Sequence, residues 1–579
     1  MRQILASLAF AAAAALNVAI VVQPVPVQAQ VRLPALGEAE GDEISLSEER
    51  KVGDQIMREI YADPDVIDDP VEFAYVDTIF ERLLAASDRR GNISPEMKES
   101  FAWTPFLVKD KSFNAFALPG GYIGVHLGLI ASAGNRDELA SVLGHELSHI
   151  TQRHIARAAA ANKRQTIPTL IAMVLGLVAT AKSGSTDLPM AILTSGQAAM
   201  ATNQLSFSRE MEREADRFGL DVMTDAGYAP AGMASMFERL DLAMRINDTN
   251  QYPWLRNHPL TIERISEARL RARSVAPEDP RDAHLAEHAL MRARARALVD
   301  PSDPSLRNMQ HLARLEDPQT DVERIGALYG GALASVELRD FDAAHVFLAH
   351  AQQVMDAHAQ AASAWAAAHP AEAAAPKVRA TAAGVSSLPS YADLLAPVAA
   401  SAGAGPGTPP AIWPFEPEVA RDFKLLRLQA AVAQQSVHEI EAAEAVLVED
   451  GTRPTVLAHA QAAMGRWLAH DPQATVALRR QTEALQTWVA LHPKDSYAWT
   501  LLSQCAEPLG QKLRAIRAEA ESHAARGDVF GALDRMRAGQ RAAREPNADF
   551  VEASIIDTRT RELEVQRRDL IKEFGDPNR

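Results

Sequence analysis

Residues 141–150 read Ser-Val-Leu-Gly-His-Glu-Leu-Ser-His-Ile, and this stretch determines how the surrounding region is expected to fold. Residues four positions apart share one face of an α-helix, so His145 and His149 are expected one turn apart. Two imidazoles at this spacing can hold one zinc ion, and Glu146 can act beside them as a general base. Zinc lowers the pKa of a bound water to about 7. The pattern is typical of a zinc-peptidase helix.

The alternative is a solvated surface helix that carries these three residues by chance. Leu139, Val142, Leu143, Leu147 and Ile150 make the expected helix apolar on both sides of the motif. Titratable side chains in so apolar a helix are costly unless they are used. The apolar context therefore favours the catalytic interpretation. Asn135, followed by Glu138, is the expected capped start of this helix.

The composition limits the partners of the chain. It has 579 residues, a formal net charge of −16 and only 6% aromatic residues. This length predicts about two to four domains. The acidic balance argues against nucleic acids and anionic membrane surfaces as partners. Cys505 is the only cysteine, which excludes an intrachain disulfide and a lipid anchor near the expected cleavage site.

The first 29 residues resemble a secretory signal peptide. Arg2 supplies a positive charge, residues 4–22 are almost entirely apolar, and Val27-Gln28-Ala29 places small residues at a cleavage site. We expect cleavage after Ala29 and export of the mature chain. An uncleaved anchor is the alternative, because the apolar run approaches the length that spans a bilayer.

Helices and a small sheet are expected ahead of the zinc motif. Residues 46–56 and 71–84 show helical periodicity on either side of Pro70, and residues 104–110 alternate as a short strand does. Residues 114–118 and 122–125 predict two further strands around a Pro-Gly-Gly turn. An exposed strand here could pair with an extended substrate. A core hairpin is the alternative.

A third protein ligand is needed, because catalytic zinc usually takes three. Residues 206–219 predict a helix on which Glu212 and Asp216 lie together beside the apolar stripe, while Glu210 and Glu214 point elsewhere. Glu212 could therefore ligate zinc, and Asp216 could accept the free N–H of a zinc-bound histidine. The alternative is a charged surface helix.

Several motifs together resemble the HtpX/BepA-type zinc metallopeptidases. The zinc helix, Glu212-x-x-Ala-Asp216, the stretch 114–117 before Gly-Gly, Leu33-Pro-Ala-Leu-Gly and Asn257-His-Pro-Leu260 with Arg264 carry this resemblance, which covers nearly the whole mature chain. It implies one zinc ion held by His145, His149 and Glu212, with Glu146 as the base and Asp216 orienting a ligand.

The resemblance also implies further site residues. Arg264 would support the site, and the backbone of Asn114, Ala115, Phe116 and Ala117 would bind substrate. His258 would lie on a loop, since it precedes Pro259, and would occupy the fourth position on zinc. There it would hold the enzyme latent or, alternatively, stabilise the transition state.

Residues 165–205 contain an apolar run, 167–181, that is too short to span a bilayer comfortably. We expect a mobile cover over the cleft. Contact with a membrane surface is the alternative.

The C-terminal half is expected to be a tetratricopeptide-type helical domain over residues 276–579, after a catalytic domain over 30–275. Turn and small-residue patterns near residues 339–351, 499–515 and 527–539 predict paired helices. Such stacks form concave surfaces that hold extended segments. An Ala/Pro/Gly-rich stretch over 361–414 is expected to be a flexible insertion.

These observations predict a mainly α protein, with an α+β gluzincin-like catalytic domain and an all-α solenoid. By resemblance, it would be an exported zinc endopeptidase of the periplasm that degrades misassembled outer-membrane β-barrel proteins, such as the lipopolysaccharide-transport barrel. Its repeat domain would present these clients, and the barrel-assembly machinery would be its docking partner. The alternative is an assembly chaperone or scaffold in which proteolysis is secondary.

Overall fold

The computed structural model describes residues 44–161, 171, 208–246, 252–273, 284–315, 320–373 and 415–574. Three expectations lie wholly or largely outside these residues. They are the signal peptide over 1–29, the apolar segment within 165–205 and the domain boundary near 276–280.

The first helices begin where the sequence supplies a cap. Helix α2 (Leu46–Tyr61) begins with a capping box in which Ser45 and Glu48 bond each other's backbone N–H groups. Helix α3 (Pro70–Arg89) begins at the proline itself, capped by Asp69. Proline suits this first position because the N–H it lacks has no helical partner there. Strand β1 (Val66–Ile67) and helix α4 (Pro95–Ser100) complete this part.

The sheet has the strand order β1-β2-β4-β3. Strand β2 (Thr104–Val108) pairs in parallel with β4 (Tyr122–His126), and β3 (Ala115–Leu118) pairs with β4 antiparallel. The predicted hairpin is confirmed, and its turn uses Gly120 and Gly121 at φ of 76° and 92°, which glycine adopts without strain. Strand β3 therefore lies at an edge of the described sheet.

Helix α6 (Arg136–Thr151) carries the zinc motif and is buried along its whole length. The predicted cap is present, since the Asn135 side chain accepts a hydrogen bond from the Glu138 N–H. Helix α5 (Leu127–Ser132) precedes α6, and α7 (His154–Ala161) follows it.

Helix α11 (Arg209–Asp225) packs against α6 at a contact between two glycines. A Cβ atom added to Gly219 would lie 2.9 Å from the backbone N of His145, and one added to Gly144 would lie 3.1 Å from the Gly219 carbonyl. The glycines thus let the two backbones approach closely, which brings the acidic residues of α11 beside the histidines of α6. Helices α12 (Ala231–Ile246), α13 (Trp254–Asn257) and α14 (Ile262–Arg273) follow.

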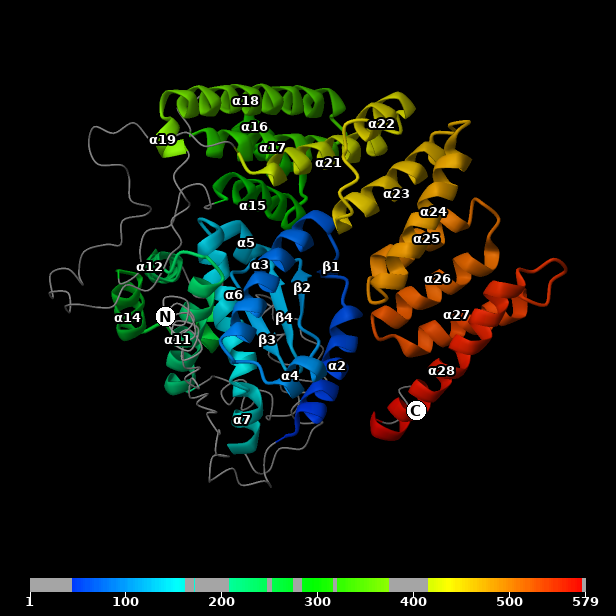
Figure 1. Cartoon of the computed structure of the whole chain (residues 1–579), viewed down its shortest axis with the longest axis horizontal. Coiled ribbons are helices and arrows are strands. Elements are labelled where there is room, and N and C mark those ends of the chain that lie inside the picture. Colours follow the sequence, from blue (N-terminus) through cyan, green and yellow to red (C-terminus); the bar gives the residue numbers. More distant parts are fainter. Residues whose placement is uncertain are drawn as a thin grey trace, which may run out of the picture. The chain divides into compact units, whose positions relative to one another are not determined.

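The C-terminal half of the described chain is helical, and most neighbours in sequence also pack together (Figure 1). The helices are α15 (Leu285–Val299), α16 (Asp303–Arg314), α17 (Asp321–Glu337), α18 (Phe341–Ala368), α19 (Pro370–Ala373), α21 (Pro417–Gln434), α22 (Val437–Glu444), α23 (Arg453–Leu468), α24 (Ala474–Leu491), α25 (Ser496–Ala506), α26 (Lys512–Ala525), α27 (Val529–Ala542) and α28 (Phe550–Phe574). Each of the three stretches expected to hold paired helices includes the turn between two consecutive helices: α17 and α18, α25 and α26, and α26 and α27.

One hydrophobic core extends across residue 275, where the catalytic and repeat domains were expected to divide. Helix α15 packs on α5 and α3 as well as on α17 (Figure 1). One apolar cluster includes buried residues from Val71 of α3 to Ala462 of α23. Arg294 of α15 also donates two hydrogen bonds of 2.7 Å to Asp69, the cap of α3. The first helix after residue 275 is therefore built into the catalytic region.

The predicted fold class, mainly α with a small sheet, is confirmed. Within the described residues, no helix is both long and apolar enough to cross a membrane. One boundary differs from the expectation: residues 361–368 continue α18, and α19 follows. The cause is the alanine-rich sequence there, because alanine is the strongest helix former. The remainder of the expected insertion, from residue 374 to 414, lies outside the described residues.

Candidate metal centre and active site

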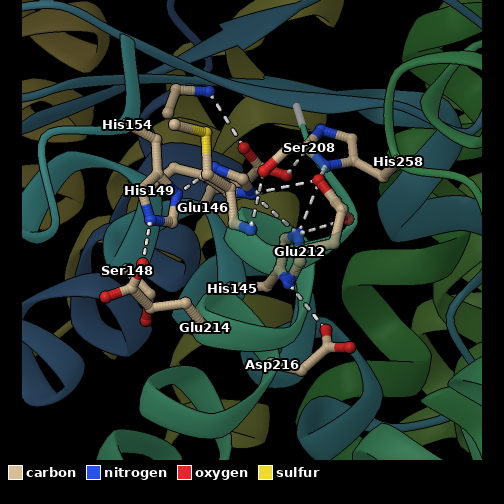
Figure 2. Close-up of polar contacts among 12 residues, drawn as sticks. His145, Glu146, Ser148, His149, His154, Ser208, Glu212, Glu214, Asp216 and His258 are labelled. Carbon is tan, nitrogen blue, oxygen red and sulfur yellow. Dashed lines mark hydrogen bonds and ion pairs between the residues drawn. The ribbon is translucent and has the colours of Figure 1, made fainter. Parts of the chain in front are cut away.

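Two helices and the residue that follows a third bring four potential metal ligands together. They are His145 and His149 of α6, Glu212 of α11 and His258, which directly follows α13 (Figure 2). One ligand atom from each lies within 4.8 Å of every other, and all four residues are buried. Within the described residues this is the one group of its kind.

The spacing of these atoms suits a tetrahedral zinc ion. The Nε2 atoms of His145 and His149 lie 3.0 Å apart, and His145 Nε2 lies 3.2 Å from His258 Nδ1. The Glu212 carboxylate oxygens lie 3.6 Å from each of the first two imidazoles. Ligands bound at 2.0–2.1 Å with tetrahedral angles are separated by about 3.3 Å. The four residues present therefore fit zinc.

Glu212 has an oxygen available for a metal. Its Oε2 is buried and has no hydrogen-bond partner, although Arg264 Nη1 forms an ion pair with it at 2.8 Å. Burial raises the pKa of Glu212, but His258, His145 and Arg264 outweigh burial and lower it below the ordinary value. The group is thus a carboxylate, the form that ligates zinc.

Asp216 contacts His145, as the helix phase predicts. Its Oδ1 lies 2.9 Å from His145 Nδ1, so the imidazole carries its proton there and turns Nε2 towards the other ligands. Burial raises the pKa of Asp216, but Arg264 and His145 lower it to about 2. Arg264 holds Asp216 with two hydrogen bonds of 2.6 and 2.8 Å and also donates to the Pro259 carbonyl at 2.9 Å. Arg264 therefore supports both Asp216 and the His258 loop.

His149 is suited to ligation in its neutral form. It is completely enclosed, and burial lowers its pKa well below the ordinary value, assisted by His145, His258 and other nearby positive groups. A metal ligand must offer an unprotonated nitrogen. The surroundings thus favour the ligating state of this imidazole.

Glu146 lies beside the cluster and is held by two donors. The Trp254 indole N–H donates to Oε1 at 2.9 Å, and the Ala117 backbone N–H donates to Oε2 at 3.0 Å. His258 Nε2 lies 3.5 Å from the same Oε1. Both carboxylate oxygens of the expected base are therefore engaged in this arrangement.

The residues expected to bind substrate have different surroundings. Ala117, in the edge strand β3, directs its N–H at Glu146. The Asn114 side chain instead faces His126, with its Nδ2 3.4 Å from Nε2, and the Phe116 ring packs edge-on against Phe106. Ala115 is buried in its pairing with Val125. Among these four, Ala117 is the one that the described structure brings to the candidate base.

Two residues at the site were not singled out from the sequence. Trp254 stacks on His258, with ring centroids 4.8 Å apart, and contacts the base. His154 contacts His149. A signal for His154 existed, since it is a third histidine five positions beyond the motif. Trp254 carried no local signal, because only the fold brings α13 to α6.

Comparison with known proteins agrees with this geometry. Residues 70–272 match the family described as Peptidase family M48. The chain is 32% identical over 324 residues to a putative β-barrel assembly-enhancing protease of Vibrio cholerae, a match covering 55% of this chain and 63% of the relative.

Two further relatives match over shorter stretches. A β-barrel assembly-enhancing protease of Escherichia coli is 32% identical over 245 residues, which cover 42% of this chain and 48% of the relative. The mitochondrial metalloendopeptidase OMA1 of Schizosaccharomyces pombe is 28% identical over 205 residues, covering 35% and 55%. Each match spans less than two thirds of the relative.

These relatives confirm the resemblance predicted from the zinc motifs over about half of the chain, which is less than the nearly whole mature chain expected. The matched segment 70–272 includes every residue of the candidate metal centre. The part of this chain that matches peptidase family M48 is therefore the part that carries the candidate metal centre.

Proposed function

We propose that this chain is a zinc-dependent endopeptidase of the periplasm that acts on outer-membrane β-barrel proteins during their assembly. The observation that carries the proposal is the convergence of His145, His149 and Glu212 beside the buried carboxylate of Glu146. The printed names of the bacterial relatives support the β-barrel substrate class.

Each residue of the site would have a separate role in peptide hydrolysis. His145, His149 and Glu212 would hold zinc, which supplies a Lewis acid and an activated water when bound. Glu146 would take a proton from that water and deliver it to the leaving amine. Ala117 lies in the edge strand, so its N–H could bond the main chain of an extended substrate once Glu146 releases it.

His258 and Trp254 suggest that the described arrangement is a latent one. His258 stands among the metal ligands, and Trp254 holds an oxygen of the base. Catalytic zinc sites keep one position open for water. Displacement of the short α13 segment would free that position and the base together.

The repeat-type helices would present clients or dock the assembly machinery, since stacked helix pairs form extended binding surfaces. This arrangement also favours a second candidate function, an assembly scaffold in which proteolysis is secondary. For export, we propose removal of residues 1–29. N-terminal sequencing should then find Gln30 first, and an intact N-terminus would contradict export by cleavage.

The Glu146→Gln variant tests the activity. It keeps every proposed ligand but removes the base, so it should retain zinc and lose at least about 100-fold of casein cleavage. Full cleavage by the zinc-loaded variant would refute the proposal. If this variant still rescues barrel assembly in cells as well as the wild type does, the scaffold function is the principal one.

A further inference from the structure

A second series of polar contacts extends outwards from the metal centre, and it begins at His149. His154, the first residue of α7, is completely buried, and its Nδ1 lies 2.9 Å from Nδ1 of His149 (Figure 2). On its other side, His154 Nε2 lies 3.1 Å from Oε2 of Glu214. Glu214 also accepts a hydrogen bond of 2.9 Å from Arg157. The proposed mechanism uses none of these three residues.

The partners determine where the protons lie. The Glu214 carboxylate can only accept, so the proton of neutral His154 is on Nε2 and its Nδ1 is an acceptor. His149 must then donate from its own Nδ1. This places the unprotonated Nε2 of His149 among the other ligands, 3.0 Å from His145 Nε2. One assignment of protons satisfies each hydrogen bond from Glu214 through His154 to His149, and it leaves the Nε2 atom of His149 free of a proton and able to bind a metal.

The backbone turns sharply to make this contact. Arg153, between α6 and α7, has a φ of 53°, in the left-handed region that side chains other than glycine and asparagine seldom adopt. Such a conformation is strained and persists only where the surroundings enforce it. Here it directs His154 back onto the zinc helix. The Arg153 side chain is fixed by Glu49 at 3.1 Å.

A carboxylate of α11 contacts each histidine of the zinc motif, either directly or through a second imidazole. Asp216 accepts directly from His145, whereas Glu214 acts on His149 through one intervening imidazole. Both carboxylates come from α11, which also supplies the ligand Glu212. One helix thus orients both histidines of the motif.

We infer that His154 and Glu214 are positioning residues that fix the tautomer and ring orientation of His149 for zinc. The inference rests on the proposed zinc site and deepens it. Outer-shell partners of zinc ligands typically change metal affinity by 10–100-fold when they are removed, and the same range is expected here.

The test compares His154→Leu with His154→Gln in the full chain. Leucine removes both polar contacts, while glutamine can accept from His149 and donate to Glu214. Glu214→Ala is compared with Glu210→Ala, a control on the same helix. The Glu210 side chain is 79% exposed and forms a long ion pair of 3.4 Å with Arg213. Zinc affinity is measured by chelator competition, and ligand geometry by the visible spectrum of the cobalt-substituted protein.

We expect His154→Leu and Glu214→Ala to weaken zinc binding by about 10–100-fold and to alter the cobalt spectrum. His154→Gln should recover most of the affinity, and Glu210→Ala should match the wild type. Equal losses for leucine and glutamine, or an unchanged affinity for Glu214→Ala, would overturn the inference. Glu214→Ala decides the matter if His154→Leu fails to fold.

A Glu212→Gln variant distinguishes a failure of the positioning role from a failure of the proposed zinc site. If Glu212→Gln abolishes zinc binding while His154→Leu and Glu214→Ala do not weaken it, the positioning role alone is wrong. If Glu212→Gln binds zinc as tightly as the wild type, the proposed zinc site itself is wrong.

Discussion

Three acidic residues of α11 have three different surroundings within two helical turns. Glu212 faces the histidines, Asp216 bonds His145 and Arg264, and Glu214 bonds His154 at the side of the cluster. Glu210 lies exposed beyond them. Helical phase explains the separation, because residues two apart point in clearly different directions. The chemistry of each carboxylate therefore follows from its position on one helix.

Glu212→Gln should weaken zinc binding by more than about 100-fold, beyond the range typical of outer-shell partners. The amide loses the charge that offsets the metal and offers a poorer donor oxygen. Glu214→Gln should have a far smaller effect, since its amide oxygen can still accept from His154. Titration with a competing chelator measures both. Equal losses would show that the ligand has been assigned to the wrong carboxylate.

The sequence could predict most of this centre, because helical phase is local information. His145, His149, Glu212 and Asp216 are brought together as their spacing indicates. Phase alone placed Glu214 away from the ligands and missed its contact with His154. That contact depends on the turn at Arg153, whose left-handed conformation no residue-type preference predicts.

At the scale of elements, α13 is short but contacts the centre twice. The His258 backbone N–H donates to the Trp254 carbonyl at 2.8 Å, and the two rings stack. The side chains that reach the metal cluster and the base are thus fixed to each other. Movement of this one segment would change both contacts.

We expect His258→Ala to raise unregulated casein cleavage several-fold while zinc stays bound. Three protein ligands suffice for catalytic zinc, and the fourth position becomes open to water. Zinc content and cleavage rate are measured on the same preparation. Reduced cleavage with zinc retained would instead assign His258 to stabilisation of the transition state.

At the scale of the molecule, ion pairs join the region after residue 275 to the catalytic region. Arg453, the first residue of α23, bonds Asp68 ahead of α3 at 2.7 Å and Asp495 ahead of α25 at 2.8 Å. Asp422 of α21 is buried near Arg421, Glu287 and Arg294, and burial raises its pKa to about 7. Local patterns predicted the helix pairs but not this shared core, because periodicity shows which face is buried and not against what.

Asp422→Asn should stabilise the protein more at pH 8 than at pH 5. The folded pKa of Asp422 lies above its ordinary value of 3.8. The free energy of unfolding therefore falls as the pH rises from about 4 through about 7, by on the order of a few kcal/mol. Asparagine stays neutral and avoids this loss. Thermal midpoints of both proteins at the two pH values measure it.

Glu72 contributes to the pH dependence of both proteins. Its buried carboxyl also has a raised pKa, through burial and the nearby Asp69, and Asp422 adds to this rise, so the variant removes that contribution as well. A difference in midpoint that is the same at pH 5 and pH 8 would show that Asp422 does not titrate on folding.

The proposed ligands enter the chain in a fixed order, two on α6, then Glu212 on α11, then His258. A protein leaves the ribosome N-terminus first, so the paired imidazoles are made well before the carboxylate. Two ligands fall short of the three that catalytic zinc takes. A half-synthesised chain would therefore lack a complete zinc site. Once Glu212 has been added, the segment bearing Trp254 and His258 follows soon after. A chain that has the three proposed ligands but not yet this covering segment would therefore exist only briefly during synthesis.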